Sequence, residues 1–283
     1  MNIQWFPGHM TKTYRQIEEK LKLIDVVVEV LDARIPLSSK NPDIEKITKG
    51  KPRIVVLNKS DLADEAMTKK WMEYYKSQGV LSCTADCAKG KGINESVALI
   101  KKAIADKIAQ NQEKGMTRAI KVLVAGVPNA GKSSYINRLS GRASATVGDR
   151  PGVTRGQQWI RLSSGIELLD TPGVLWPKFE DEKVGEHLAF TGAVKDEVLD
   201  VELLACKLAE FLNENYREMF CTRYKLTDTE GLQGFELVEM LGKKRGFVIS
   251  GGEIDFLRAS NILLDEFRSA KIGRITIEKP QGE

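Results

Sequence analysis

A loop that can bind phosphate groups lies between Gly126 and Ser133, in the stretch GVPNAGKS. It follows an apolar run and precedes a helical pattern, the context that a phosphate-binding loop requires and a chance glycine turn lacks. Backbone N–H groups of such a loop close around phosphate oxygens, and the following helix adds a favourable dipole. We expect Lys132 to reach the β- and γ-phosphates and the Ser133 hydroxyl to bind Mg²⁺. The predicted phosphate-binding residues are Pro128, Asn129, Ala130, Gly131, Lys132, Ser133 and Ser134.

Two motifs further along the chain can complete a phosphate and magnesium site. In ELLDTPG, Asp170 ends an apolar run, where its carboxylate can hold Mg²⁺ through water, and the Gly173 N–H can meet the γ-phosphate. In GDRPGVT, Thr154 can supply a second hydroxyl to Mg²⁺ and sense the γ-phosphate. A D-x-P-G turn or a single threonine is common by itself. In this order, however, the motifs predict a nucleotide-dependent switch with Ser133, Thr154 and Asp170 as its magnesium residues.

The stretch VVLNKSD carries the residues of a guanine-reading loop. The Asp61 carboxylate can accept hydrogen bonds from guanine N1–H and the 2-amino group together, and adenine offers no such pair of donors. Asn58 would brace the neighbouring loops, and the Lys59 stem would lie over the base. The alternative is an asparagine-lysine turn after a strand. Further on, Thr84 and Ala85 in SCTAD are similar to the loop whose backbone N–H groups contact guanine O6.

The order of these motifs is unusual, because the base loop comes before the phosphate loop. Gly126 lies 68 residues after Asn58, whereas an ordinary GTPase has its phosphate loop first. Domain termini usually lie close together at the surface, so a circular permutation keeps the same packed sheet. The helical pattern near 95–110 would be joined through the polar segment 109–118 to the phosphate-loop strand. The chain then leaves the nucleotide domain just past Gly173, so whatever follows is attached to the switch.

The elements that must position these residues alternate between strands and helices. The helical patterns fall at residues 11–23, 65–77, 95–110 and 131–139. Most of the β-rich runs are apolar on both faces, as in a covered and mainly parallel sheet. This alternation predicts an α/β fold with a doubly wound, mostly parallel six-stranded sheet. The six runs are Val26–Leu31, Arg53–Leu57, Val80–Ser82, Ile120–Ala125, Gln158–Leu162 and Ile166–Leu169.

After about residue 177 the pattern changes to helices. Helical spacing recurs over 199–212, 231–241 and 253–267, and a short β-like tail, GRITIEKP, follows. We therefore expect three parts: an N-terminal segment at 1–13, a nucleotide-binding domain at 14–178 and a small, mostly α-helical domain at 179–283.

Composition favours a cytoplasmic globular protein. Among 283 residues, 42% are hydrophobic and 29% charged, and no apolar run approaches a membrane span or a signal peptide. Four cysteines in such a chain are expected to be reduced, and Cys83 and Cys87 lack a second Cys/His pair for a metal. The first 178 residues hold 29 Lys/Arg and 18 Asp/Glu, a net charge of +11, while the rest carries −7. This charge fits either a solvated surface or an approach to a polyanion.

The motif order, together with QWFPGHM, DARIP, GDRPGVT and LLDTPGVLWPKFED, resembles the circularly permuted GTPases, and specifically the ribosome biogenesis GTPase A family. The resemblance covers essentially the whole chain, including KKRGFVISGG. It implies a GTPase that hydrolyses GTP, is stimulated by the large ribosomal subunit and acts late in 50S assembly. The implied partners are GTP or GDP, the large-subunit precursor, rRNA and ribosomal proteins, with no membrane. We expect a monomer.

The catalytic assignment rests partly on this resemblance. Val174 occupies the position where Ras-like enzymes carry a water-orienting glutamine, so another residue must help. His9 in WFPGHM is the proposed catalytic residue of the family; alternatively, Trp5 and Phe6 only pin the N-terminus and His9 is solvated. Asn129 resembles an asparagine that coordinates K⁺ in GTPases of the tRNA-modification type, or it only suits a tight turn. The expected catalytic residues are His9, Lys132, Thr154 and Gly173.

The same motifs are compatible with other functions. The nearest alternative is a GTPase of tRNA modification or another RNA-linked process. An enzyme that uses GTP to drive chemistry elsewhere would need a second reactive cluster, and a membrane-remodelling GTPase would need a long coiled coil or a basic amphipathic helix. The sequence offers neither. The basic run at 242–246 is a candidate RNA contact, or an ordinary solvated turn.

Overall fold

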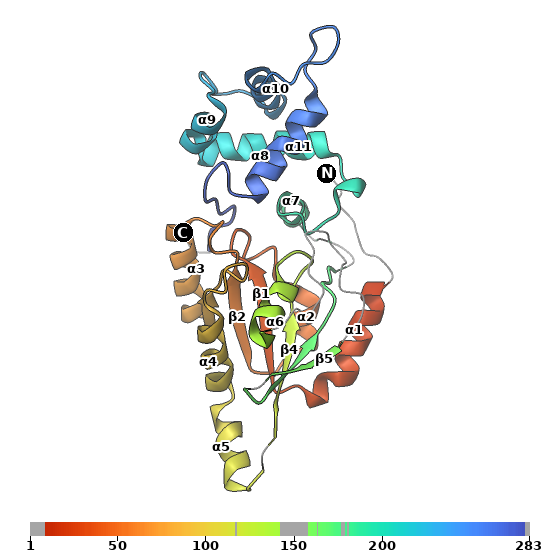
Figure 1. Ribbon diagram of the computed structural model, residues 1–283, viewed down its shortest axis with the longest axis vertical. Helices are drawn as coiled ribbons and strands as arrows, with labels where there is room; N and C mark the ends of the chain where they lie inside the picture. Colours follow the sequence, from red (N-terminus) through yellow and green to blue (C-terminus); the bar gives the residue numbers. More distant parts are fainter. Residues whose placement is uncertain are drawn as a thin grey trace.

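The part of the chain expected to bind nucleotide is built on one sheet, whose strand order is β3-β2-β1-β4-β6-β5. Strands β2, β1, β4 and β5 follow one another across it in Figure 1. The computed structural model describes residues 9–116, 118–141, 158–162, 164–176, 179 and 181–280, without the side chains of His9 and Gln158. All neighbouring strands are parallel except β5 and β6. The predicted six-stranded, mostly parallel sheet is confirmed. The strands are β1 Val26–Asp32, β2 Arg53–Asn58, β3 Leu81–Thr84, β4 Ile120–Ala125, β5 Gln158–Arg161 and β6 Ile166–Asp170.

Both faces of the sheet are covered, and alternate residues of one strand face opposite sides. On one face, Val28 of β1 shares a core with Ile100 and Tyr135, which come from helices α4 and α6. On the other face, Val27 shares a core with Ile17 of α1. The helices of this part are α1 His9–Lys20, α2 Pro42–Ile47, α3 Glu65–Ser77, α4 Ile93–Ala103, α5 Ala105–Glu113 and α6 Lys132–Ser140.

The sheet has a switch point between β1 and β4. The chain builds β1, β2 and β3 outward on one side and β4, β6 and β5 on the other. In doubly wound sheets, ligands bind at the carboxyl ends of the strands where the order reverses. We therefore expect a ligand site among the residues that follow β1, β2, β4 and β6.

The helices largely follow local sequence signals. Helix α3 spans the predicted residues, and the Asp64 carboxylate caps it by accepting from the Met67 N–H at 2.8 Å. The single helix expected at 95–110 is instead two helices, because Ile104 leaves helical geometry at φ −126°. Short helix α2 was not predicted, although Asn41 caps it and Pro42 occupies its first turn.

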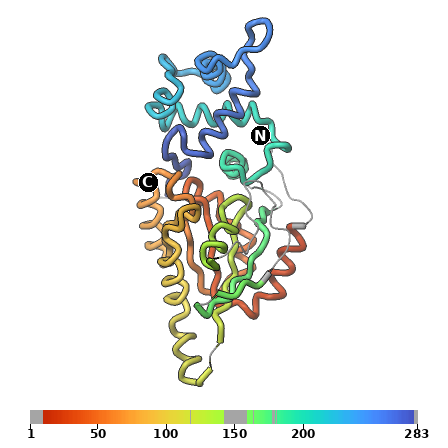
Figure 2. Tube along the Cα trace, in the orientation of Figure 1, coloured from red at the N-terminus to blue at the C-terminus, as the bar shows by residue number. Residues whose placement is uncertain are grey.

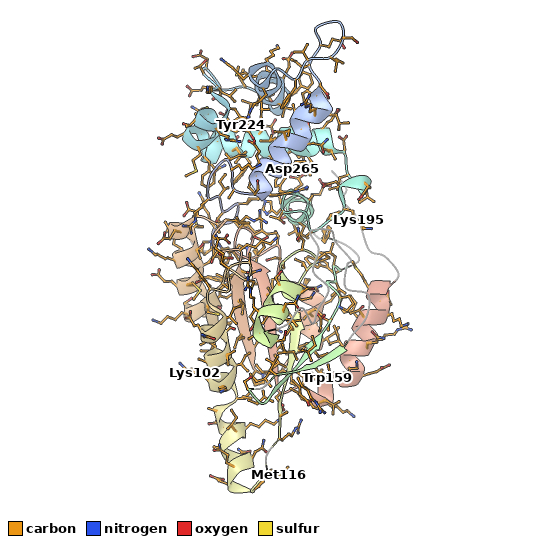
Figure 3. The ribbon with its side chains drawn as sticks, in the orientation of Figure 1. Lys102, Met116, Trp159, Lys195, Tyr224 and Asp265 are labelled. Carbon is orange, nitrogen blue, oxygen red and sulfur yellow. The ribbon has the colours of Figure 1, made fainter. Side chains whose placement is uncertain are left out.

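A helical layer, α7 to α11, packs on the carboxyl-end side of the sheet (Figure 1). Tyr224 and Asp265 lie in this layer, whereas Met116 lies beyond α5 at the opposite end of the molecule (Figure 3). Helices α7 and α9 were not predicted. The helices of the layer are α7 Glu182–Phe190, α8 Val201–Asn215, α9 Arg217–Tyr224, α10 Gly234–Arg245 and α11 Phe256–Arg268.

The sheet and the helical layer share a hydrophobic core, and the end of the chain returns from the helical layer to the sheet. Val27 and Leu123 of the sheet belong to the same buried cluster as Leu263 of α11 and Ile277. After α11, the chain runs back to the loop before α3 (Figure 2), where the Ile275 N–H donates to the Leu62 oxygen at 3.1 Å. The Ile277 N–H then donates to the Arg34 oxygen, in the loop that follows β1, at 2.8 Å. The β-like tail forms no strand: it hydrogen-bonds with loops instead of joining the sheet. The expected limit at residue 13 falls inside α1.

Other sequence expectations concern membranes and cysteines. Within the described residues, no helix is long and apolar enough to cross a bilayer. Cys83, Cys87, Cys206 and Cys221 are free thiols, and burial raises the pKa of Cys83 to about 12. No cluster of three His, Cys, Asp or Glu suited to a metal ion occurs in the described part of the chain.

Candidate nucleotide-binding site

The predicted phosphate loop joins β4 to α6, as the motif requires. Gly131 precedes α6 with φ +93°, and a Cβ there would lie 2.1 Å from Asn58 Nδ2, so only glycine fits. Lys132 is 6% exposed, while Ser133 and Ser134 are half-buried in the first turn of α6. The α6 N-terminus thus presents its dipole and backbone N–H groups at the switch point of the sheet.

The D-x-x-G motif lies against the phosphate loop. Asp170 ends β6 and is fully buried, and a Cβ on Gly173 would lie 2.7 Å from the Pro128 Cα. Burial lowers the pKa of Lys132, and the Asp170 carboxylate partly offsets that effect. A carboxylate and a serine hydroxyl are hard oxygen donors, so Asp170 and Ser133 fit Mg²⁺. Thr154 lies outside the described residues.

The predicted guanine-reading loop meets the predicted phosphate loop in space, although the sequence separates them. Asn58 Nδ2 donates to the Ala130 oxygen at 2.8 Å, and Asn58 Oδ1 accepts from the Cys87 N–H at 3.1 Å. Asn58 therefore braces both neighbouring loops, as the sequence predicted. The arrangement is that of a permuted domain, in which strand order changes along the chain but the packed site is preserved.

The acceptor predicted to read the base is half-buried at the edge of this loop. Asp61 Oδ2 lies 3.3 Å from Lys89 Nζ, which lies 3.3 Å from Asp86 Oδ2 as well. A base that reaches Asp61 must share or replace the lysine contact. The Ala85 N–H donates to the Leu57 oxygen at 2.8 Å, and thus continues the pairing of β2 with β3. The contact of Thr84 and Ala85 with the base stays a prediction.

A buried ion network behind Lys59 was not found from the sequence. Arg34 donates to both carboxylate oxygens of Asp32, at 2.9 and 2.7 Å, and Lys59 Nζ lies 3.2 Å from Asp32 Oδ2. Burial alone would raise the pKa of the Asp32 carboxyl, but Arg34 and Lys59 outweigh it and hold that pKa well below its usual range. Motif DARIP contains both Asp32 and Arg34, so it positions the lysine of the base loop.

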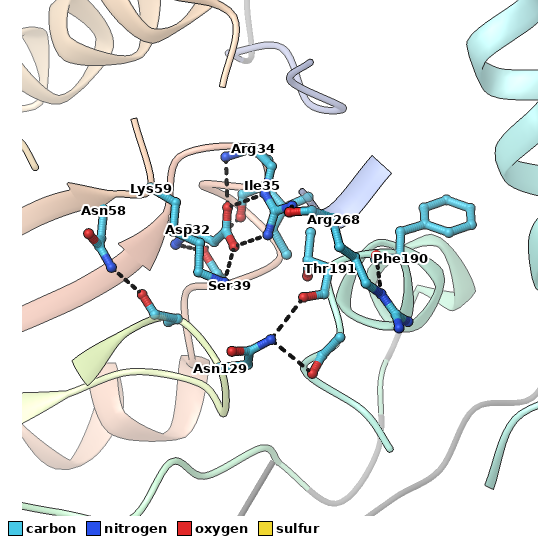
Figure 4. A network of polar contacts seen from close by, with 12 residues as sticks. Asp32, Arg34, Ile35, Ser39, Asn58, Lys59, Asn129, Phe190, Thr191 and Arg268 are labelled. Carbon is cyan, nitrogen blue, oxygen red and sulfur yellow. Dashed lines mark hydrogen bonds and ion pairs between the residues drawn. The ribbon is translucent and has the colours of Figure 1, made fainter. Parts of the chain in front are cut away.

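The phosphate loop also contacts the helical layer (Figure 4). Asn129 Nδ2 donates to the oxygens of Thr191 and Gly192 at 3.3 and 3.4 Å. Asn129 and Lys59 both have φ +58°, a left-handed conformation that is uncommon outside glycine and concentrates at functional sites. Arg268 Nε of α11 donates to the oxygen of Phe190, the residue before Thr191, at 3.1 Å. Arg34 Nη1 in turn donates to the Arg268 oxygen at 3.2 Å.

Helix α1 lies beside the segment that follows Gly173. The Leu175 N–H donates to Met10 Sδ at 3.4 Å, and the Tyr14 hydroxyl donates to the Leu175 oxygen at 3.0 Å. Val174 is 2% exposed and cannot form a side-chain hydrogen bond with water. His9 begins α1 next to Met10, but its side chain lies outside the described part of the structure.

Comparison with known proteins adds a family and two solved structures. A family model described as 50S ribosome-binding GTPase matches residues 121–225. Ribosome biogenesis GTPase A of Bacillus pumilus is 48% identical over 282 residues, covering 99% of this chain and all of the relative. The namesake from Thermotoga maritima is 34% identical, covering 99% and 95%.

The solved structures cover nearly the whole chain. GNP-bound YlqF of T. maritima has a TM-score of 0.63 at 30% identity, covering 95% of this chain and 99% of that one. Its GDP-bound structure has a TM-score of 0.67 at 30% identity, covering 94% and 100%.

Proposed function

Because this chain belongs to the ribosome biogenesis GTPase A family, whose fold is a circularly permuted GTPase, we propose that it acts late in assembly of the large (50S) ribosomal subunit, binding the precursor in its GTP state. The chain is a GTPase of ribosome biogenesis. The observation that carries the guanine-nucleotide site is the 2.8 Å hydrogen bond from Asn58 to Ala130, which joins the base and phosphate loops. We place its action in the cytoplasm, as a monomer.

The phosphate side of the site supplies the chemistry. Lys132 projects from the start of α6 beside the buried Asp170, and so brings positive charge to the β- and γ-phosphates. Ser133, Thr154 and, through water, Asp170 would hold Mg²⁺, which would supply further charge neutralisation. Gly173 lies against Pro128, where its N–H can meet the γ-phosphate.

His9 is our candidate for positioning the attacking water. Met10 and Tyr14 hold Leu175, so the first turn of α1 lies next to the segment that follows Gly173. Val174, buried at the usual glutamine position, leaves that task to another residue. His9 is the residue directly before Met10, which supports this role.

Asn129 is our candidate K⁺ ligand. Its backbone is already in the conformation of a close turn, and its side chain faces the carbonyl oxygens of Thr191 and Gly192. A monovalent cation beside the phosphates would supply positive charge in place of an arginine finger.

The helical layer is our candidate for rRNA contact. Lys243, Lys244 and Arg245 are exposed in the last turn of α10. Nearby, Arg258 stacks over the Phe247 ring at 4.6 Å, and Phe235 is 59% exposed. Cations interleaved with exposed aromatic rings suit phosphates and unstacked bases.

The proposed function is tested by GTP turnover with and without purified large subunits. We expect slow intrinsic hydrolysis, stimulation by the subunits, and co-sedimentation with them that is stronger with a non-hydrolysable GTP analogue than with GDP. His9→Ala should keep nucleotide affinity and lower turnover about a hundredfold. Equal binding in the two nucleotide states, or no stimulation, would contradict the assembly role; unchanged turnover in His9→Ala would contradict the histidine assignment.

A further inference from the structure

The base loop is held from outside by the end of the chain. We propose that residues 271–280, which we name the C-terminal strap, position this loop so that Asp61 meets the guanine base. The strap would then be part of the guanine-specific site, although it is more than 200 residues away in sequence. This inference rests on the proposed guanine-nucleotide function and adds specificity-setting residues to it.

Arg274 of the strap contacts the loop on both sides of Asp61. Its Nη2 donates to the Ser60 oxygen at 2.9 Å, and its Nε donates to the Ala63 oxygen at 2.8 Å. Ser60 directly precedes Asp61, so the guanidinium fixes the peptide from which the carboxylate projects. Hydrogen bonds from a charged donor are stronger than those between neutral groups.

The strap backbone continues this contact. The Ile275 N–H donates to the Leu62 oxygen at 3.1 Å, and the Asp64 N–H donates to the Thr276 hydroxyl at 3.0 Å. With the two Arg274 bonds, four hydrogen bonds join the strap to the loop between residue 60 and residue 64. A loop held at this many backbone groups has little freedom to shift its acceptor.

The strap also reaches the opposite side of the loop. The Ile277 N–H donates to the Arg34 oxygen at 2.8 Å. The Arg34 side chain holds Asp32, and Asp32 holds Lys59. The strap is therefore connected to Lys59 through Arg34 and Asp32. It is connected to Asp61 through the backbone of residues 60–64.

The far end of the strap is tied to both parts of the molecule. The Glu278 carboxylate accepts from the N–H groups of Leu37 and Ser38 at 2.6 and 3.0 Å, and it lies 2.8 Å from His187 Nδ1 of α7. The Tyr216 hydroxyl, from the helical layer, donates to the Thr276 oxygen at 2.8 Å. Because the strap binds the helical layer and the base loop together, a partner that displaces the helical layer must change guanine affinity, and the converse holds by linkage.

The strap inference is tested by comparing the affinities of the protein for GDP and for IDP. IDP lacks the 2-amino group that Asp61 is expected to bind. Dissociation constants of both nucleotides are measured for the full-length wild type, Arg274→Ala and Thr276→Val, with Lys279→Ala, an exposed strap residue, as the control. We expect Arg274→Ala to lower the preference for GDP over IDP about three- to tenfold and to leave IDP affinity near that of the wild type. Thr276→Val should give a smaller loss, and Lys279→Ala none.

A melting temperature is recorded for each variant, so that a general loss of stability is distinguished from a change in the preference for GDP over IDP. Equal weakening of GDP and IDP, or an unchanged preference in both Arg274→Ala and Thr276→Val, would overturn the inference. If the wild type binds GDP no better than ADP, the proposed guanine site itself fails, and the strap inference falls with it.

Discussion

The helical layer and the C-terminal strap that follows it meet the nucleotide site at opposite ends, and the two contacts differ in kind. At the phosphate end, Asn129 reaches the oxygens of Thr191 and Gly192 through long hydrogen bonds of 3.3 and 3.4 Å. At the base end, the strap forms several bonds of 2.8–3.1 Å with residues 60–64. Long hydrogen bonds are weak. The polar contact at the phosphate end is thus weaker than the polar contact at the base end.

Removal of the helical layer would disturb the nucleotide domain as well. Ile35 and Ile44 of the nucleotide domain share one buried cluster with Leu188 and Phe267 of the helical layer. A chain that ends near residue 177 would expose that cluster to water, and burial of apolar surface is the main stabilising term in folding. Single side-chain changes at the two contacts therefore separate their roles better than removal of the layer.

The largest expected effect is at the buried network that links both parts. Arg34 is 1% exposed and holds Asp32 as well as the Arg268 oxygen. Arg34→Ala would leave a buried carboxylate short of its main partner, so we expect a loss of about 3–5 kcal/mol in the free energy of unfolding, measured by urea denaturation.

The matched control for Arg34→Ala is Arg161→Ala. The Arg161 side chain is 86% exposed and lies 2.8 Å from Glu167, so its removal should cost less than about 1 kcal/mol. Equal losses in the two variants would show that the Arg34 network does not hold the parts together.

Next in size is the effect at the phosphate end. Lys132→Ala removes the cation beside Asp170, so GTP turnover should fall at least a hundredfold, or about 3 kcal/mol in activation free energy. The preference for GDP over IDP should persist among molecules that still bind nucleotide. The control is Lys114→Ala, because the Lys114 side chain is exposed and directly follows α5, far from the phosphate loop. Normal turnover in Lys132→Ala would remove the phosphate loop from the mechanism.

The smallest expected effect is at Asn129. Turnover of the wild type should be a few-fold faster in K⁺ than in Na⁺ if Asn129 is a K⁺ ligand, and Asn129→Ala should abolish that difference. Stability should change little, since the bonds to Thr191 and Gly192 are long. Equal wild-type rates in the two salts would contradict the K⁺ assignment.

Local signals in the sequence are sufficient to predict many of the helices and strands. The β4 strand and helix α3 begin and end at the predicted residues, because apolar periodicity and the Asp64 cap mark them. The break at Ile104 has no glycine or proline to mark it, so one long helix was predicted where two occur.

The contacts that complete the site could not be predicted in this way. Arg274 and Ser60 are 214 residues apart, and nothing local to either signals their meeting. The structural role of the DARIP motif cannot be predicted from the sequence either, because the pairing of Arg34 with the Arg268 oxygen depends on how the helical layer packs. Motif spacing identifies which residues can do chemistry, whereas tertiary packing decides which residues hold them in place.

The most direct measurement of the central claim, that the strap and the base loop act as one unit, is hydrogen exchange of the full-length protein with and without GDP. The N–H groups of Ile275 and Ile277 donate to Leu62 and Arg34, so base binding that fixes the loop must also protect the strap. We predict slower exchange in residues 58–64 and 271–280 together, with α5 at 105–113 unchanged. Protection confined to residues 58–64, with the strap exchanging as it does without nucleotide, would contradict the account.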